Sequence, residues 1–142
     1  MPHNIVLREA TLEDVNATAN VYLASRKKFL FFAPLIHTDE SIYQWVRNTL
    51  IPKEQVIVAE EGNTLVGMMS LTKNEITGKI NQFYIHPKSV GQGTGTLMLE
   101  KAKAILGSPI QLYTFEQNIR ARQFYERHEF KAIKFNDGSN NE

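Results

Sequence analysis

Three glycines at alternate positions occur in one short stretch of the sequence, Val90-Gly91-Gln92-Gly93-Thr94-Gly95-Thr96. The stretch separates a strand-like run, Ile80 to Ile85, from a helix-like run, Thr96 to Leu106. Glycine reaches φ > 0 without steric cost and lets an anion approach the backbone closely. The following helix adds N–H groups that lack helical partners, together with the positive end of its dipole. The pattern therefore indicates phosphate binding.

The glycines alone do not specify which phosphate is bound. A P-loop ends in Gly-Lys-Ser/Thr, whereas this loop ends in Gly95-Thr96-Leu97 and offers no lysine. A dinucleotide-binding loop follows the first strand of a βαβ unit, whereas this loop lies past the middle of the chain. Taken by themselves, the glycines fit a structural turn as well as a phosphate cradle.

The flanking residues are more specific. The loop is preceded by Phe83-Tyr84-Ile85-His86-Pro87 and followed by Leu97-Met98-Leu99, an order that resembles the coenzyme A-binding motif of the GNAT superfamily of N-acetyltransferases. A second group is similar to that family's signature Asn-x-x-Ala-x-x-Phe-Tyr-x-x-x-Gly-Phe; it consists of Asn118, Ala121, Phe124, Tyr125, Glu126 and Phe130. The resemblance covers nearly the whole chain. It departs from the family at Val90, where Arg or Gln is usual, at Glu129, where glycine is usual, and at the short C-terminus.

The resemblance implies acetyl-CoA as co-substrate and no metal. It implies that the main chain of Phe83, Tyr84 and Ile85 pairs with the pantetheine arm like an added strand and offers an N–H to the thioester carbonyl. Asn118 is expected to cap a helix, to bond the pantetheine, or to do both. The remaining coenzyme-binding residues that it implies are Val90, Gly91, Gln92, Gly93, Thr94, Gly95 and Thr96.

Tyr125 is the predicted proton donor to the leaving thiolate and a further coenzyme contact. A phenol with a pKa of about 10 stays protonated at neutral pH and can donate as the thiolate forms. Spacing alone favours a core aromatic next to Phe124, since aromatic pairs are common on buried helix faces. The matched motif favours the proton donor.

The general base is left open by the sequence. Many relatives carry an acid in the central strand, but the corresponding stretch here is Ile80-Asn81-Gln82. The candidates are Glu116, Glu40 and His37, or a water held by Asn81 and Gln82. The hypothesis is an N-acetyltransferase that acts on a primary amine of a small molecule or peptide by direct attack in a ternary complex. The alternatives are a preference for a longer acyl group and a non-catalytic acyl-CoA-binding or regulatory module.

Composition narrows the class of protein. The 142 residues predict one domain with a sizeable core. The sequence has no cysteine, which excludes disulfides, thiolate catalysis and Cys-based metal sites and suits the cytoplasm. A formal charge of +1 gives no argument for nucleic acid or an anionic membrane. No apolar run approaches transmembrane length, and no secretory signal is expected at the N-terminus.

Periodicity predicts the elements that position these residues. Strands are expected at 4–9, 55–60, 64–71, 79–85, 110–116 and 130–135, and Gly67 indicates a bulge or a close approach. Thr11 with Asp14 and Thr38 are predicted to begin the first two helices, the second of which should end at Ile51-Pro52. The helix from Thr96 should bury Leu97, Met98, Ala102, Ile105 and Leu106. The last helix should present Ala121, Phe124, Tyr125 and His128.

The order β α α β β β α β α β predicts a single α/β domain over residues 1–142, with a GNAT-like mixed, mostly antiparallel sheet flanked by helices. The apolar run Phe29 to Pro34 is expected in the core or in the wall of an acceptor pocket. Residues 136–142 form a polar tail, so the seventh strand of the family is expected to be missing. An open edge at Phe130 to Phe135 would then favour a homodimer.

Overall fold

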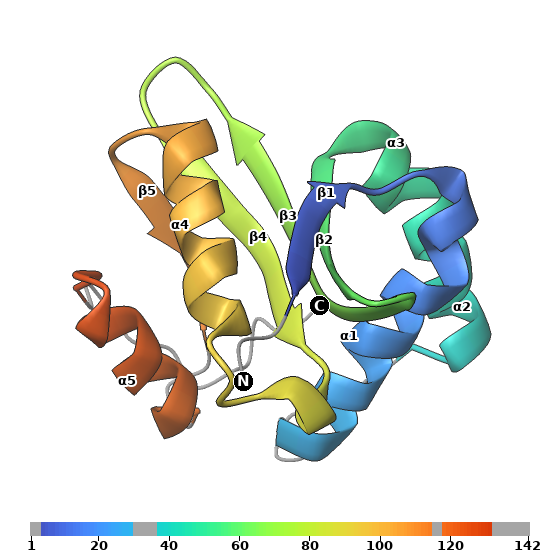
Figure 1. The fold of residues 1–142 in the computed structure, drawn as a ribbon. Helices are drawn as coiled ribbons and strands as arrows, with labels where there is room; N and C mark the ends of the chain where they lie inside the picture. The colour runs from blue at the N-terminus through green and yellow to red at the C-terminus, as the bar shows by residue number, and fades with distance from the viewer. Residues whose placement is uncertain (1–3, 30–36, 115–117, 132–142) are drawn as a thin grey trace.

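The computed structural model describes residues 4–29, 37–114 and 118–131 of the chain (Figure 1). Within these residues, five strands form one sheet in the order β1-β2-β3-β4-β5. Every neighbouring pair is antiparallel except β4 and β5, which are parallel. This mixed, mostly antiparallel sheet confirms the predicted fold class. The strands are β1 (Ile5–Glu9), β2 (Gln55–Glu61), β3 (Thr64–Lys73), β4 (Gly78–Ile85) and β5 (Ile110–Leu112).

Helices cover both faces of the sheet, as Figure 1 shows. One face carries α1 (Val15–Phe29) and α2 (Asp39–Trp45), which continues through a π-helical segment η2 (Val46–Leu50) into α3 (Ile51–Lys53). The other face carries α4 (Thr94–Leu106) and α5 (Ile119–Arg127). Two 3₁₀ turns, η1 (Leu12–Asp14) and η3 (Pro87–Ser89), precede α1 and α4.

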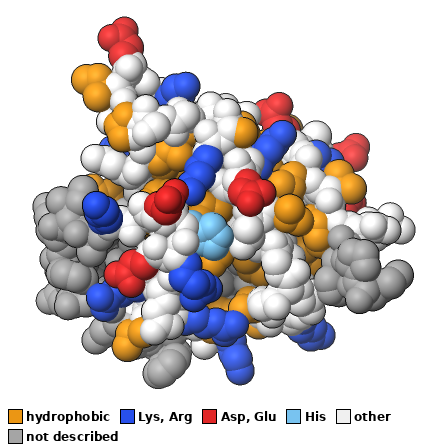
Figure 2. Space-filling view, turned by 60° about the vertical axis from the view of Figure 1, so that its left-hand side comes forward, with side chains coloured by type: hydrophobic (Ala, Val, Ile, Leu, Met, Phe, Trp, Pro, Cys, Tyr) orange, Lys and Arg blue, Asp and Glu red, His pale blue; other side chains and the backbone are white. Residues whose placement is uncertain are grey.

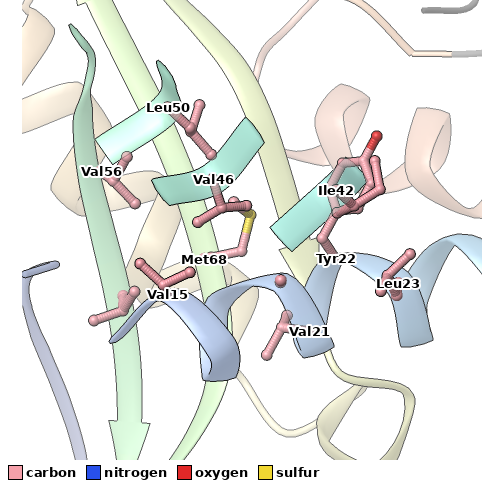
Figure 3. Close-up of a cluster of buried hydrophobic side chains, with 11 residues drawn as sticks. Val15, Val21, Tyr22, Leu23, Ile42, Val46, Leu50, Val56 and Met68 are labelled. Atoms are coloured by element: carbon pink, nitrogen blue, oxygen red, sulfur yellow. The ribbon is translucent and has the colours of Figure 1, made fainter. Parts of the chain in front are cut away.

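Each face of the sheet has its own buried cluster. Side chains of α1 and of the α2–η2 segment pack on Val56, Val58 and Met68 (Figure 3). Alternate side chains of the same strands, including Ile57 and Met69, pack against α4 and Tyr125 on the opposite face. The central strands β2 and β3 are therefore buried on both faces, which is why their sequences read as nearly continuous apolar runs.

The first helical segment begins as predicted. The Thr11 hydroxyl accepts a hydrogen bond from the Glu13 N–H, and Asp14 Oδ2 accepts one from the Thr11 N–H at 2.8 Å. Arg8 of β1 donates to both oxygens of Asp14, at 2.8 and 2.9 Å. Leu12 stands at helical spacing from Val15, Ala19 and Tyr22, which indicates a buried position, but it is 59% exposed, because residues 12–14 form a 3₁₀ turn that changes its angular position.

The second helical segment begins at Thr38, whose hydroxyl accepts from the Ser41 N–H. It was expected to end at Ile51-Pro52 but continues to Lys53. The π turn accounts for this, since the Ile51 N–H bonds to the Val46 carbonyl five residues back. Proline is tolerated in the first turn of the helix that follows, where its missing N–H costs little.

Two glycines in the hairpins act in different ways. Gly62 has φ +64° in the turn between β2 and β3. The bulge and the close approach that were predicted at Gly67 are both confirmed. The register of β3 against β2 shifts by one residue between Ala59 and Glu60 of β2. A Cβ built on Gly67 would also lie 2.7 Å from the Met98 sulfur, so α4 approaches the strand backbone closely.

The second half of the chain departs from the prediction in three places. Helix α4 begins at Thr94, two residues earlier than expected, and ends at Leu106 as the helix-like run predicted, with Gly107 as its C-cap. Leu97 is 43% exposed because the buried stripe runs through Thr94, Met98, Leu99, Ala102 and Leu106 instead. The strand expected at 110–116 extends only to Leu112 among the described residues. Glu116, most of Phe29 to Pro34, residues 132–135 of the expected last strand and the tail 136–142 lie outside the described residues.

No helix in the described ranges is long and apolar enough to span a bilayer. On the face shown in Figure 2, Lys and Arg side chains are interspersed with Asp and Glu side chains. This mixture agrees with the formal charge of +1.

Candidate functional site

Strands β4 and β5 separate part of the way along the sheet. They pair only at Gly78, Lys79 and Ile80 of β4, opposite Ile110 to Leu112. Beyond this point β4 continues to Ile85, whereas residues 113 and 114 form no strand. Within the described residues, the 81–85 edge of β4 that faces away from β3 has no partner strand. Such an edge presents N–H and C=O groups to an extended ligand.

A β-bulge lies where the two strands separate. Ile80 pairs with Leu71 and Gln82 pairs with Ser70, so Asn81 is the extra residue on β4. A bulge redirects side chains and often adjoins a functional site. The Asn81 amide Nδ2 donates to Thr72 Oγ1 and to Glu54 Oε1, both at 3.0 Å.

A cavity of about 370 Å³ lies beside Gln82 on the α1–α2 face. Tyr22 and Trp45 both line this cavity. Their ring centroids lie 5.4 Å apart, and the ring planes are inclined at 57°. Two aromatic rings with a few polar groups form the usual lining of a small-ligand site. The lining residues are Tyr22, His37, Ser41, Ile42, Trp45 and Gln82.

The candidates for the general base that the sequence offered lie at different sites in the structure. His37 lines this cavity, as Gln82 does. Glu40 does not line it, and borders instead an open depression between α1 and α2 that also contacts Arg47. Asn81 and Gln82 lie next to each other at the bulge, as a water-holding pair would require.

The glycine loop follows directly after the unpaired edge of β4. His86 Nδ1 accepts from the Lys88 N–H at 3.2 Å and begins the η3 turn. Gly91 and Gly93 have φ of +84° and +87°, and a Cβ built on either would meet no atom within 4 Å. The backbone of the loop is therefore open on the side where an anion would approach.

The N-terminus of α4 closes this loop. Thr94 is 1% exposed, and its hydroxyl has no hydrogen-bond partner in the structure. Buried hydroxyls are normally paired, so this oxygen is available to a ligand or to water. Val90, which replaces the usual polar residue, is half-buried in extended conformation and leads into the loop.

Two residues of the predicted loop contact α5. A Cβ on Gly95 would lie 3.0 Å from Ile85 Cδ1 and 3.1 Å from Phe124 Cζ, so this glycine lets the helix approach its neighbours. Thr96 Oγ1 lies 3.3 Å from His128 Nε2. The other ring nitrogen of His128, Nδ1, lies 2.9 Å from the Phe124 carbonyl, which only accepts, so Nδ1 carries a proton.

Helix α5 positions the predicted proton donor. Asn118 caps it, with Oδ1 accepting from the Ala121 N–H at 3.3 Å, which confirms the predicted cap. Tyr125 is 9% exposed, and its ring centroid lies 5.9 Å from those of Phe83 and Phe130. Burial raises the pKa of the Tyr125 phenol, and a negative charge on an ionised Tyr84 would raise it further. The hydroxyl therefore remains protonated at neutral pH.

Tyr84 points to the opposite face, where its ring lies 5.0 Å from that of Tyr22. Burial raises its pKa, and a hydrogen bond and the positive charge of Arg26 act in the opposite direction. Arg26 is only 5% exposed, and its guanidinium lies 5.8 Å from the Tyr22 ring centroid. The Arg26 guanidinium thus lies next to Tyr22, one of the residues that line the cavity.

Sequence reasoning missed two residues of this region. Arg26 continues the helical spacing Val15, Ala19 and Tyr22, so the periodicity contained a signal that it faces inward. Glu54 had no comparable signal, because it lies in a polar stretch between a helix and a strand and meets Asn81 only in the folded chain.

The sequence profile of the acetyltransferase (GNAT) family matches residues 20–130. The chain belongs to this family, and its general chemistry is acyl transfer. A protein of Archaeoglobus fulgidus described as an uncharacterized N-acetyltransferase is 25% identical over 131 residues, which are 84% of this chain and 88% of that protein.

Solved structures share the fold. The PaiA N-acetyltransferase of Thermoplasma acidophilum, crystallised in complex with coenzyme A, has a TM-score of 0.77 and 23% identity, over 96% of this chain and 94% of that one. An acetyltransferase of Thermus thermophilus has a TM-score of 0.76 and 18% identity, over 92% of this chain and 88% of that one.

Proposed function

We propose that this protein is an acetyl-CoA-dependent N-acetyltransferase that acts on a primary amine of a small molecule or peptide, within a ternary complex in the cytoplasm. The observation that carries the proposal is the separation of β4 from β5 directly before the glycine loop. One continuous path then joins an unpaired strand edge to an anion-binding helix terminus, which suits a pantetheine arm followed by a pyrophosphate. The crystallisation of the Thermoplasma relative with coenzyme A is consistent with this path.

Acetyl-CoA supplies the activated acetyl group. In the proposed mechanism, loop N–H groups from Gly91 to Gly95 hold the pyrophosphate, and the main chain of Phe83 to Ile85 holds the pantetheine. An N–H of this strand stabilises the oxyanion that forms as the amine attacks. The Tyr125 hydroxyl gives its proton to the departing thiolate.

The cavity beside Gln82 is the proposed acceptor site. It lies on the face of β4 that carries α1 and α2, whereas Tyr125 packs on the opposite face. The two reactants would therefore reach the β4 edge from different sides, which permits direct attack without an enzyme-bound acyl intermediate. A face of an aromatic ring such as Tyr22 or Trp45 also attracts a protonated amine.

Substitution of Gly93 tests the coenzyme placement. Gly93→Asp puts a carboxylate where the phosphates approach, and we expect at least about a tenfold loss of acetyl-CoA affinity, or about 1.4 kcal/mol, in titration calorimetry. Gly93→Asn introduces the same backbone strain without the charge and should lose less. Gly62→Asp is the matched control, since Gly62 also has positive φ and open space but lies in the β2–β3 turn. Equal affinity of the Gly93→Asp variant and the wild type would contradict the placement.

A thiol-release assay with acetyl-CoA and a panel of primary amines tests catalysis itself. We expect amine-dependent release of free thiol. Coenzyme binding without release by any amine would instead support a non-catalytic acyl-CoA-binding module.

A further inference from the structure

The proposed reaction needs a proton acceptor, because most primary amines are protonated at neutral pH and an ammonium has no lone pair for attack. Among the candidates named from the sequence, Glu40 borders a different depression and His37 is exposed at the cavity. The structure brings another carboxylate to the bulge. We infer that Glu54, held by Asn81, is the general base for the acceptor amine; the inference rests on the proposed function.

Glu54 is held once through its backbone and once through its side chain. Its backbone N–H donates to the Leu50 carbonyl at 3.0 Å, which anchors it to the end of the helical segment. Its Oε1 accepts from Asn81 Nδ2 at 3.0 Å, and the same amide donates to Thr72 Oγ1. Glu54 is half-buried, so the carboxylate remains reachable while its position is restricted.

The bulge determines on which face of the sheet the Asn81 side chain lies. Leu71 packs in the cluster that contains α4 and Tyr125, so its neighbour Thr72 points to the α1–α2 face. Asn81 bonds to Thr72 and therefore lies on the same face. Gln82 lines the proposed acceptor cavity on that face as well. Without the extra residue, adjacent strand positions 81 and 82 would point to opposite faces.

The position along β4 is also suited to a base. Asn81 directly follows Ile80, the last residue of β4 that pairs with β5. An acyl group carried along the unpaired edge from the glycine loop would end near this point. The hydrogen bond to Asn81 thus holds the Glu54 carboxylate beside the residue that adjoins both Ile80, where this path would end, and Gln82 of the acceptor cavity.

The proton balance of the reaction is simple. Glu54, directly or through one water, takes a proton from the ammonium, and the freed lone pair attacks the thioester carbonyl carbon. A C–N bond forms and the C–S bond breaks, while the thiolate takes a proton from Tyr125. After the attack, the nitrogen still carries one proton more than the amide product, and this proton passes to the Tyr125 phenolate and restores the phenol. Glu54 returns its proton to solvent. Asn81 is a positioning residue in this scheme.

The alternative is that Glu54 only ties the start of β2 to the bulge. Glu54→Gln separates the two roles, because glutamine keeps the acceptor oxygen for Asn81 and removes only the basicity. We expect the kcat for the best amine of the panel to fall at least about 100-fold, with unchanged acetyl-CoA affinity and unfolding midpoint. Glu100→Gln is the charge-matched control, since Glu100 is exposed on α4 across the sheet.

Exchange of the two side chains completes the test. The double variant Glu54→Gln/Asn81→Asp restores a carboxylate to the same hydrogen-bonded pair, and we expect it to regain at least about tenfold in kcat over Glu54→Gln. A Glu54→Gln variant as active as the wild type overturns the assignment, and so does a loss that the exchange does not reverse. Absence of thiol release by the wild-type protein would contradict the proposed function itself, and the base with it.

Discussion

The Tyr125 phenol lies in an apolar environment that changes the energetics of proton transfer. Burial disfavours phenolate and therefore raises the Tyr125 pKa. It equally disfavours a thiolate released beside it, so the pKa of the leaving thiol should rise in the same site. The two shifts offset each other, and the donor can remain protonated in the resting state while still transferring its proton to sulfur.

Tyr125→Phe should lower kcat by about 10²–10⁴-fold, because it removes the oxygen that we propose as the proton donor to the thiolate. Coenzyme affinity should change little, since the ring and its contacts with Phe83 and Phe130 remain. Steady-state kinetics and calorimetry measure the two effects separately. Tyr113→Phe is the control, because Tyr113 is 77% exposed. Full turnover by the Tyr125 variant would show that this tyrosine serves only in packing.

At the scale of elements, Arg8 joins three segments near the N-terminus. It pairs with Asp14 at the start of the first helical segment and with Glu60 of β2, and it belongs to β1 itself. The Arg8 guanidinium and the Thr11 N–H hold the pKa of the Asp14 carboxyl below its ordinary value. Since the folded pKa is depressed, this contribution to stability is present above the unfolded pKa of about 3.9 and is lost as pH falls through the folded value.

Asp14→Asn should therefore destabilise the protein by about 1–2 kcal/mol at pH 7, through loss of the charged cap and the ion pair. The difference from the wild type should begin to shrink as the pH falls below about 4, where the carboxyl of the unfolded chain becomes protonated, and should disappear as the pH falls through the lower pKa of the folded protein. Urea unfolding at a series of pH values measures this. Glu13→Gln makes the same charge change at an exposed neighbour and should have little effect. A difference that is independent of pH would contradict the assigned role of the carboxylate.

At the scale of the whole molecule, two cores share the central strands β2 and β3. Loss of packing on one face should therefore weaken the other face as well, because Ile57 and Val58 are adjacent residues of one strand. The sequence contains one tryptophan, Trp45, which packs against the core on the α1–α2 face. The fluorescence of Trp45 can therefore report whether a substitution on the α4 face also destabilises the α1–α2 face.

Leu99→Ala removes a fully buried side chain on the α4 face and should lower the free energy of unfolding by about 2–5 kcal/mol. The midpoints from Trp45 fluorescence and from far-UV circular dichroism should fall together. Leu97→Ala is the control on the same helix and should change the free energy of unfolding by only about 0.5 kcal/mol, because Leu97 is partly exposed. A Trp45 midpoint that stays at the wild-type value would mean that the two layers unfold independently.

Features that depend only on neighbouring residues could be predicted from the sequence. The Thr11–Asp14 and Thr38 caps, the end of α4 at Gly107 and the positive φ of Gly91 and Gly93 follow from short-range sterics and hydrogen bonding. The loop and the second motif also pointed to the acetyltransferase family, because both consist of short, ordered residue patterns. Exposed Leu12 and Leu97 show the limit of periodicity, since a local 3₁₀ turn or a small rotation of a helix decides which side chain faces inward.

Contacts between segments that are distant in the sequence could be identified only in the folded chain. The point at which β4 leaves β5, the cavity between β4 and the α1–α2 layer, and the hydrogen bond between Glu54 and Asn81 join residues far apart in the chain. One extra residue at the β4 bulge turns Asn81 toward Glu54, and no local pattern encodes that choice. Side-chain direction in a strand alternates with period two, so a single extra residue determines whether Asn81 faces the same side of the sheet as Glu54.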